Sequence, residues 1–148
     1  MRINKIEYKN KILDNYSVII DVRTPLEYIE DHIPNSVNLP VLSNIQRHEI
    51  GIQYKENSFL AKKIGAQLIS ANISKIISKI KFEKKEKVLI YCWRGGLRSL
   101  SLYLVLKQIG YDVYLLEGGY KSYRKFVVNF LEKKAPNYKY NQIMGITG

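Results

Sequence analysis

Short apolar runs that alternate with helical stretches limit the fold more than any other feature of this sequence. The runs cover residues 17–22, 87–92 and 111–116. The first of them is apolar on both faces, which suits the buried centre of a parallel sheet because helices cover both sides of such a sheet. Strands that alternate with helices predict an α/β fold with a largely parallel central sheet, flanked by helices and joined by right-handed crossovers.

Local start and stop signals place the helices between these strands. Thr24 followed by Pro25 is typical of a helix start, with Thr as the N-cap and Pro in the first turn. The spacing of Ile and Leu is helical from residue 44 to residue 80, and we expect two or three helices there, interrupted near Gly51 and Asn57. The other expected elements are a short strand at residues 36–39 and helices at residues 100–109 and 120–134.

Length and composition narrow the class of protein. A chain of 148 residues is long enough for one domain with a substantial core but not for a second complete domain. Its apolar runs are too short to span a membrane, and its start lacks the core of a signal peptide, so we expect a soluble cytoplasmic chain. The single cysteine excludes an internal disulfide and a Cys-rich zinc site, and no metal is expected. The net charge of +11 indicates a polyanionic partner such as nucleic acid, or else a general lysine bias.

The end of the chain predicts a second domain that is cut short. Residues 142–148 have the pattern of a short apolar strand that runs into Gly145-Ile-Thr-Gly148. A phosphate loop of the Gly-x-x-x-x-Gly-Lys-Ser/Thr type that began at Gly145 would continue past the last residue. We therefore expect one domain over residues 1–135, and a linker with the start of a truncated P-loop domain over residues 136–148.

The segment from residue 92 to residue 99 has the composition of an anion-binding loop. It follows a buried strand and opens a helix, so its backbone N–H groups can point into one bowl, where the helix amino end adds partial positive charge. Two glycines allow backbone conformations that a Cβ would forbid, and two arginines offer donors to a tetrahedral anion. The predicted anion-binding residues are Arg94, Gly95, Gly96, Leu97, Arg98 and Ser99.

Cys92 lies at the mouth of this loop and is the predicted catalytic residue. The field that attracts an anion also stabilises a thiolate, so we expect Cys92 to be a nucleophile near neutral pH. The alternative is a buried structural cysteine at the edge of a strand. Two glycines, two arginines and a helix start close to the sulfur favour the reactive cysteine.

Further residues are expected around the loop. Asp21 and Arg23 end the first strand, and their expected role is a supporting ion pair that holds adjacent turns together. Two aromatic residues could stack on a nucleobase while two cations on the next helix contact phosphates, or the aromatic rings could simply pack against their neighbours. The candidates for these nucleic-acid contacts are Trp93, Tyr120, Lys121 and Arg124.

Several stretches of the sequence resemble a known family. Residues 21–40 are similar to the amino-terminal signature of rhodanese-like domains, and the Cys92 loop resembles their active-site loop. Among these domains the chain resembles those of the tRNA 2-selenouridine synthases, through Tyr91-Cys-Trp-Arg-Gly-Gly-Leu-Arg-Ser99 and Gly118-Gly-Tyr-Lys-Ser-Tyr-Arg124. The resemblance covers nearly the whole chain and implies a rhodanese-like fold with a helical insert at about residues 43–80.

The resemblance also implies an activity. Enzymes of this family replace the sulfur of 2-thiouridine at the tRNA wobble position by selenium through an S-geranylated intermediate. The expected co-substrates are selenophosphate and geranyl diphosphate, with no bound cofactor, and the expected partners are tRNA and a P-loop domain of the same polypeptide. In this interpretation Cys92 is the nucleophile or selenium carrier, and the loop amides and Arg98 hold the anion with help from Arg94.

The spacing within the loop leaves other chemistries open. Five residues separate Cys92 from Arg98, one more than in the usual sulfur-transferring rhodanese loop. The wider bowl favours a bulky tetrahedral anion such as selenophosphate, and the same spacing resembles that of phosphatases. The alternatives are therefore a rhodanese-type sulfurtransferase, a Cys-x5-Arg phosphatase, and a non-catalytic module that binds tRNA or a partner.

Overall fold

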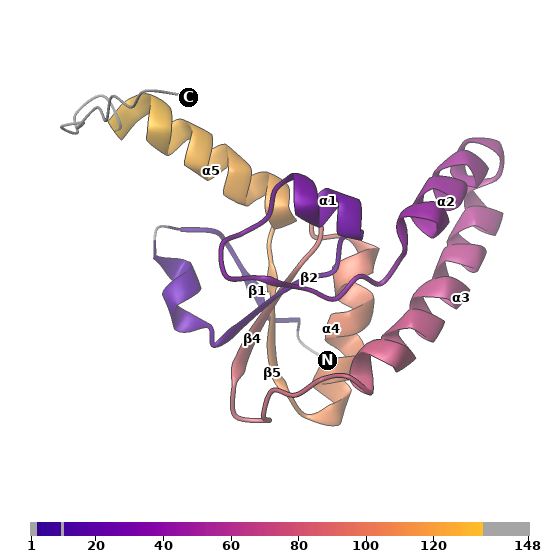
Figure 1. Ribbon diagram of the computed structural model, residues 1–148, viewed down its shortest axis with the longest axis horizontal. Helices are drawn as coiled ribbons and strands as arrows, with labels where there is room; N and C mark the ends of the chain where they lie inside the picture. The colour runs from indigo at the N-terminus through magenta and orange to yellow at the C-terminus, as the bar shows by residue number, and fades with distance from the viewer. Residues whose placement is uncertain (1–2, 10, 135–148) are drawn as a thin grey trace, which may run out of the picture.

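The core of the protein is a parallel β-sheet. The computed structural model describes residues 3–9 and 11–134, and within these residues the sheet has five strands in the order β1-β5-β4-β2-β3. All four neighbouring strand pairs are parallel. Figure 1 labels four of these strands, β1, β2, β4 and β5. The strands are β1 (Lys5–Ile6), β2 (Val18–Asp21), β3 (Val37–Asn38), β4 (Lys87–Tyr91) and β5 (Asp112–Leu116). The predicted α/β class with a parallel central sheet is confirmed.

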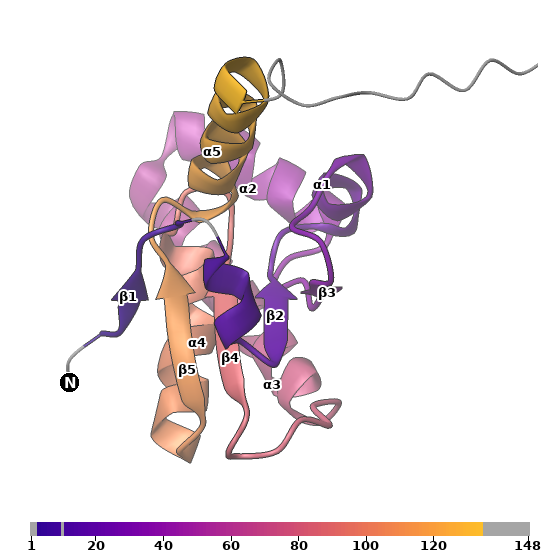
Figure 2. The same cartoon turned by 90° about the vertical axis from the view of Figure 1, so that its left-hand side faces the viewer.

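Helical segments cover both faces of the sheet (Figure 2). Residues that alternate along β4 belong to two different clusters, because successive side chains of a strand point to opposite faces. Val88 and Ile90 pack with side chains of α3 (Ser58–Ile77) and α4 (Leu97–Ile109), whereas Leu89 and Tyr91 face the other side. That other side is covered by η1 (Ile12–Asn15), the segment after α1 (Pro25–Glu30) and the start of α5 (Gly119–Lys134).

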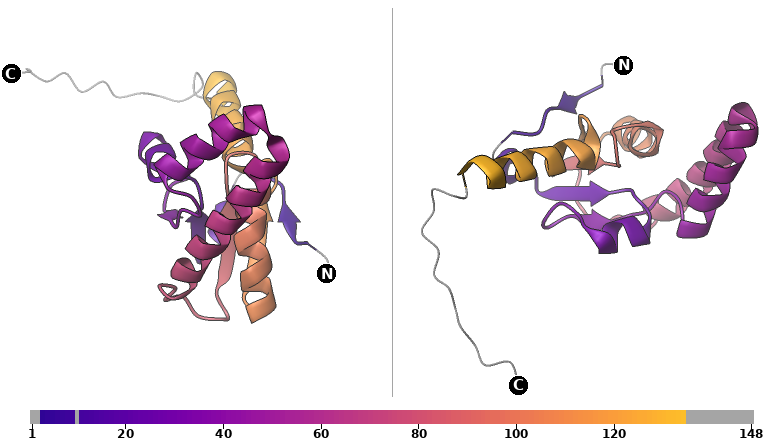
Figure 3. Two further views of the ribbon diagram at one scale, coloured as in Figure 1. Left: turned by 90° about the vertical axis from the view of Figure 1, so that its right-hand side faces the viewer. Right: turned by 90° about the horizontal axis from the view of Figure 1, so that it is seen from above.

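The predicted helical insert is a hairpin of α2 (Asn44–Glu56) and α3, which Figures 1 and 3 show projecting from the side of the sheet. The expected interruption at Asn57 is confirmed, since this residue leaves the helical conformation and its side chain caps α3. The expected interruption near Gly51 is wrong, because α2 continues through it. A single glycine weakens a helix by about 1 kcal/mol relative to alanine, which the packing of the two helices overcomes.

Local sequence signals account for several of the element ends. Thr24 is the N-cap of α1 and Pro25 occupies its first turn, as predicted; Thr24 also forms a capping box with Glu27, which was not predicted. Gly110 ends α4 with a positive φ of 106°. The short elements β1 and η1 were not predicted, since neither is long enough to show a hydrophobic period.

Two further expectations concern the limits of the chain. Among the described helices, none is long and apolar enough to cross a membrane. The strand and glycine turn predicted at residues 142–148 lie outside the described residues, as does the linker predicted from residue 136.

Candidate active site

Cys92 directly follows β4, at the carboxyl end of the sheet where ligands of such folds bind. Its side chain is on the face covered by α3 and α4 and is only 2% exposed. The sulfur is 3.2 Å from the backbone nitrogen of Gly96, which donates a hydrogen bond, and 3.2 Å from the hydroxyl oxygen of Ser99. The Ser99 hydroxyl also lies 3.1 Å from the Gly96 carbonyl oxygen, so the Gly96 N–H is the fixed donor to the sulfur.

A glycine turn supports the Cys92 loop from behind. The backbone N–H groups of Tyr120 and Lys121 donate to the carbonyl oxygens of Cys92 and Trp93, at 2.8 and 3.0 Å. Gly119 has a φ of +59°, and a Cβ at this position would lie 2.2 Å from the Cys92 oxygen. The glycine at position 119 therefore allows the backbone of this turn to contact the backbone of the Cys92 loop directly.

The two loop glycines have different roles. Gly95 has a φ of +70°, in the left-handed region that side chains rarely adopt, so the expectation of a conformation closed to other residues holds for it. Gly96 has a φ of −92° and open space where a Cβ would be, so that expectation is wrong for this residue. What Gly96 contributes is its N–H group, which points at the sulfur.

Arg98 extends from the first turn of α4 to α1, where it pairs with Glu27. Its Nη1 lies 2.7 Å from Glu27 Oε2 and its Nη2 lies 3.3 Å from Oε1, a fork-to-fork contact between residues 71 positions apart. Burial would raise the pKa of Glu27, but the hydrogen bond and charge of Arg98 outweigh it and the pKa is lowered. Sequence reasoning missed Glu27, although the Thr-x-x-Glu capping pattern marked it as a residue with a fixed side chain.

Arg94 is directed to a different part of the surface. It is exposed and lines a small hollow of about 160 Å³ together with Lys5 and Glu117, on the β1 and β5 side of the loop. Arg98 borders a separate, larger hollow on the α2 and α3 side. The two arginines predicted to hold one anion thus flank the loop from opposite sides.

The larger hollow is a groove of about 650 Å³ between the helical hairpin and the start of α4. It was not predicted, because its walls come from parts of the chain that meet only in the folded protein. Its apolar wall includes Leu42, Ile50, Ala61, Ile69 and Leu97. Four cations border the same space: Arg47, Lys55, Lys62 and Arg98. In the described residues no cluster of His, Cys, Asp or Glu could hold a metal ion.

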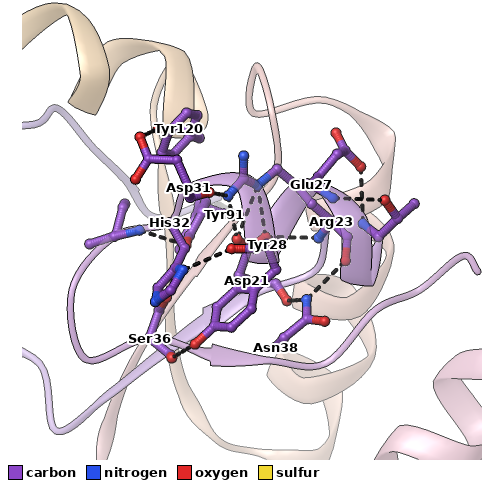
Figure 4. Close-up of polar contacts among 12 residues, drawn as sticks. Asp21, Arg23, Glu27, Tyr28, Asp31, His32, Ser36, Asn38, Tyr91 and Tyr120 are labelled. Carbon is purple, nitrogen blue, oxygen red and sulfur yellow. Dashed lines mark hydrogen bonds and ion pairs between the residues drawn. The ribbon is translucent and has the colours of Figure 1, made fainter. Parts of the chain in front are cut away.

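The expected ion pair between Asp21 and Arg23 is present and buried (Figure 4). Arg23 is 1% exposed, and its Nη2 lies 2.7 Å from Asp21 Oδ2. Although burial opposes it, the hydrogen bond with Asp21 raises the pKa of Arg23. The guanidinium also lies 4.0 Å from the centre of the Tyr120 ring and donates to the Asp31 carbonyl oxygen at 2.6 Å. This pair therefore joins the end of β2 to the start of α5.

The residues proposed for nucleic-acid contact separate into two groups. Tyr120 is 1% exposed, and its hydroxyl donates to the Asp31 carboxylate, so its ring is not available to stack on a base. Burial is the main cause of a raised pKa at the Tyr120 hydroxyl, and the hydrogen bond and charge of Asp31 raise it further. Trp93 is half-buried, with its ring 5.4 Å from that of Tyr120, whereas Lys121 and Arg124 are exposed on α5. The packing alternative therefore describes Tyr120.

Comparison with known proteins agrees with this architecture. The family model of the rhodanese-like domain matches residues 5–126. The chain belongs to the rhodanese-like family. A solved structure, the N-terminal domain of a protein from Clostridium difficile 630, is 36% identical with a TM-score of 0.70, covering 84% of this chain and 99% of that domain. A Bacillus anthracis CoADR-RHD structure with 19% identity and a TM-score of 0.57, covering 86% of this chain and 17% of that one, shares the fold.

Curated relatives confirm the expected similarity to tRNA 2-selenouridine synthases. The synthase of Nitrosomonas eutropha is 38% identical over 134 residues, which cover 88% of this rhodanese-like chain and 34% of that protein. The synthase of Shewanella halifaxensis is 36% identical over 156 aligned residues, covering 100% of this chain and 42% of the relative. The chain thus spans less than half the length of these relatives.

Proposed function

We propose that this chain is the rhodanese-like domain of a tRNA 2-selenouridine synthase, which replaces sulfur by selenium in wobble 2-thiouridine of tRNA. The observation that carries the proposal is the Cys92 sulfur, which lies between the Gly96 N–H and the Ser99 hydroxyl in a Cys-x5-Arg loop. The similarity to synthases along nearly the whole chain supports a substrate of this class for the loop. A P-loop domain in the rest of the polypeptide is part of the proposal.

The loop supports a role in handling selenophosphate. Cys92 is the nucleophile or the selenium carrier, and the Gly96 N–H stabilises its sulfur as an anion. Arg98, with the loop amides, holds the tetrahedral donor, and Arg94 adds positive charge from the other side of the loop.

The groove beside the loop supports geranyl diphosphate as the second co-substrate. The apolar wall formed by Ile50, Ile69 and Leu97 suits a hydrocarbon chain, whose burial is favourable at roughly 25 cal/mol per Å². Arg47, Lys55 and Lys62 on the border of the groove suit the diphosphate. The groove adjoins the loop through Leu97 and Arg98, so the S-geranylated intermediate would form next to the loop.

The first turns of α5 support contact with tRNA close to the loop. Lys121 is exposed, and its backbone N–H is bonded to the Trp93 carbonyl oxygen, so its charge is anchored next to the Cys92 loop. Arg124 is exposed one turn later on the same helix. Trp93 is the remaining candidate for stacking on a nucleobase.

Substitution of the only cysteine tests the proposal most directly. In the complete enzyme, Cys92→Ala should abolish selenation of tRNA but retain geranylation, because only the selenium step uses the thiol. The products are measured by mass spectrometry of nucleosides from tRNA incubated with selenophosphate and geranyl diphosphate. Ser74→Ala, an exposed position on α3, is the control and should retain both steps. Full selenation by the Cys92 variant would exclude a catalytic role for this residue.

The loop spacing keeps a phosphatase as the second candidate function. A phosphatase needs an acid to protonate its leaving group. Three carboxyls near the loop are paired: Asp21 with Arg23, Asp31 with Tyr120 and Glu27 with Arg98. The fourth, Glu117, is exposed beside Arg94, on the side of the loop away from Arg98. We therefore expect little turnover of a generic phosphate ester. Robust turnover of this ester, or of thiosulfate with cyanide, would favour the phosphatase or the sulfurtransferase instead. Tight tRNA binding without any turnover would favour a non-catalytic module.

A further inference from the structure

Arg98 is already occupied by a carboxylate in the free protein. Both of its terminal nitrogens contact Glu27, at 2.7 and 3.3 Å. The next residue along the chain, Ser99, contacts the Cys92 sulfur, so the pair borders the reactive loop. The two side chains retain 16% and 26% of their exposure, which leaves the pair open to a ligand.

Glu27 is held in place independently of Arg98. Its Oε2 accepts a hydrogen bond from the Thr24 backbone at 3.0 Å, and its own backbone N–H donates to the Thr24 hydroxyl at 3.3 Å. Thr24 is 4% exposed and follows the buried Arg23. Because this capping box fixes the carboxylate, Arg98 is the partner that can move away when another anion arrives.

A carboxylate and a tetrahedral anion use the same donors of a guanidinium. Both bind it best through two parallel N–H···O bonds, so an anion that takes these donors must displace Glu27. The displaced Glu27 carboxylate keeps its hydrogen bond to Thr24 and some contact with water, so the exchange is feasible. The net binding free energy of the incoming anion is its interaction with Arg98 minus the Glu27–Arg98 interaction that it replaces. A doubly charged anion is attracted to the guanidinium more strongly than a singly charged one, so it displaces Glu27 at a lower concentration.

We propose that Glu27 competes with the anionic substrate for Arg98 and so raises the binding strength that an anion needs in order to occupy the Cys92 loop, which favours strongly bound, phosphate-like anions. This inference rests on the proposed function in one respect, the binding of an anionic donor at Cys92. It assigns a role to a residue outside the loop, on α1.

The single cysteine allows a test that needs neither tRNA nor selenophosphate. Every alkylation of a thiol in this chain reports on Cys92. Iodoacetamide is neutral and measures access to the sulfur, whereas iodoacetate carries one negative charge and also senses whether Arg98 is free. The ratio of the two rate constants, measured by mass spectrometry of the intact protein, therefore reports the positive potential at the loop.

Glu27→Gln is the informative variant, because glutamine also forms a capping box at this helix position and the change removes only the charge. We expect the iodoacetate to iodoacetamide ratio to rise about tenfold, since a competing negative charge is lost beside the site. Inorganic phosphate should protect Cys92 from iodoacetamide at about tenfold lower concentration for the same reason.

Two matched variants separate competition from a general change in charge. Glu30→Gln removes an exposed carboxylate from the same helix, and we expect it to change the ratio less than about twofold. Glu27→Gln combined with Arg98→Gln should lose the whole increase, because the effect acts through Arg98. An unchanged or lower ratio in Glu27→Gln, an equal rise in Glu30→Gln, or a rise that persists without Arg98 would each overturn the proposal.

A failure of this test is distinguishable from a failure of the proposed function. If alkylation responds as expected but Cys92→Ala retains selenation, the anion filter stands and the synthase assignment falls. If selenation depends on Cys92 but the alkylation ratio does not respond to Glu27, the filter falls and the synthase assignment stands.

Discussion

The Cys92 loop lies between two regions that use the same chemistry differently. On one side, the inner wall consists of Asp21, Arg23, Gly119 and Tyr120, and on the other the outer rim consists of Glu27, Arg98 and the groove. Each side contains one arginine forked onto one carboxylate, with a shortest N–O distance of 2.7 Å. Arg23 and Asp21 are 1% and 0% exposed, whereas Arg98 and Glu27 are 16% and 26% exposed.

The difference in burial makes the Asp21–Arg23 pair part of the scaffold and the Glu27–Arg98 pair a contact that a ligand can replace. Loss of one partner in the inner wall leaves a charge with no access to water, which is strongly unfavourable. Loss of one partner in the outer rim leaves a charge that water can still reach. The same pair of residue types therefore fixes the fold on one side of the sulfur and can open for a ligand on the other.

The largest effect is expected from Arg23→Ala. This change leaves Asp21 buried without its partner and should lower the free energy of unfolding by about 3–5 kcal/mol. Arg98→Ala should cost less than about 1 kcal/mol, because its pair is partly solvated. Both values come from urea denaturation followed by circular dichroism. Equal costs for the two variants would contradict the distinction between inner wall and outer rim.

A smaller effect is expected from Gly119→Ala. The added methyl group would lie 2.2 Å from the Cys92 carbonyl oxygen in a left-handed backbone conformation, so the loop must shift. We expect a loss of about 1–3 kcal/mol in stability and slower alkylation of Cys92. Gly51→Ala is the matched control, since its methyl group would meet only the flexible end of Arg47. A variant at position 119 with normal stability and normal alkylation would mean that the inner wall does not hold the loop.

The smallest effect is a dependence of stability on pH at the outer rim. Burial opposes the shift, but Arg98 lowers the pKa of Glu27 below its ordinary value of 4.5. The stabilisation is therefore complete above that value and is lost as the pH falls through the lower pKa of the folded protein. We expect the difference in unfolding free energy between the native protein and Glu27→Gln to be constant near neutral pH and to shrink in acid. A difference that increases in acid would contradict this sign.

The sequence predicted those strands, helix starts and ion pairs that are determined by residues close together in the chain. The apolar runs at residues 17–22 and 87–92 marked β2 and β4, and the Thr24-Pro25 pair marked the start of α1. The Asp21–Arg23 pair was also predictable, because the two residues lie two positions apart at the end of one strand. In each case the physical signal, a period or a cap, is contained in a few consecutive residues.

What was missed depends on contacts between distant segments. Glu27 meets Arg98 only because α1 and the start of α4 converge above the sheet, and the groove exists only because the hairpin folds back toward α4. Tyr120 has the residue type of a stacking platform, but it is buried against Arg23, which follows β2, and Asp31, which ends α1. Contacts between segments that are distant in the sequence leave no pattern in a few consecutive residues.

The two backbone hydrogen bonds from the start of α5 to the Cys92 loop link distant parts of the molecule mechanically. They join the helix to the carbonyl groups of Cys92 and Trp93 rather than to flexible side chains. Figure 1 shows that the rest of α5 extends away from the sheet, so its first turn is the part that contacts the reactive loop. The backbone that carries the sulfur is therefore joined directly to the helix that presents Lys121 and Arg124 to solvent.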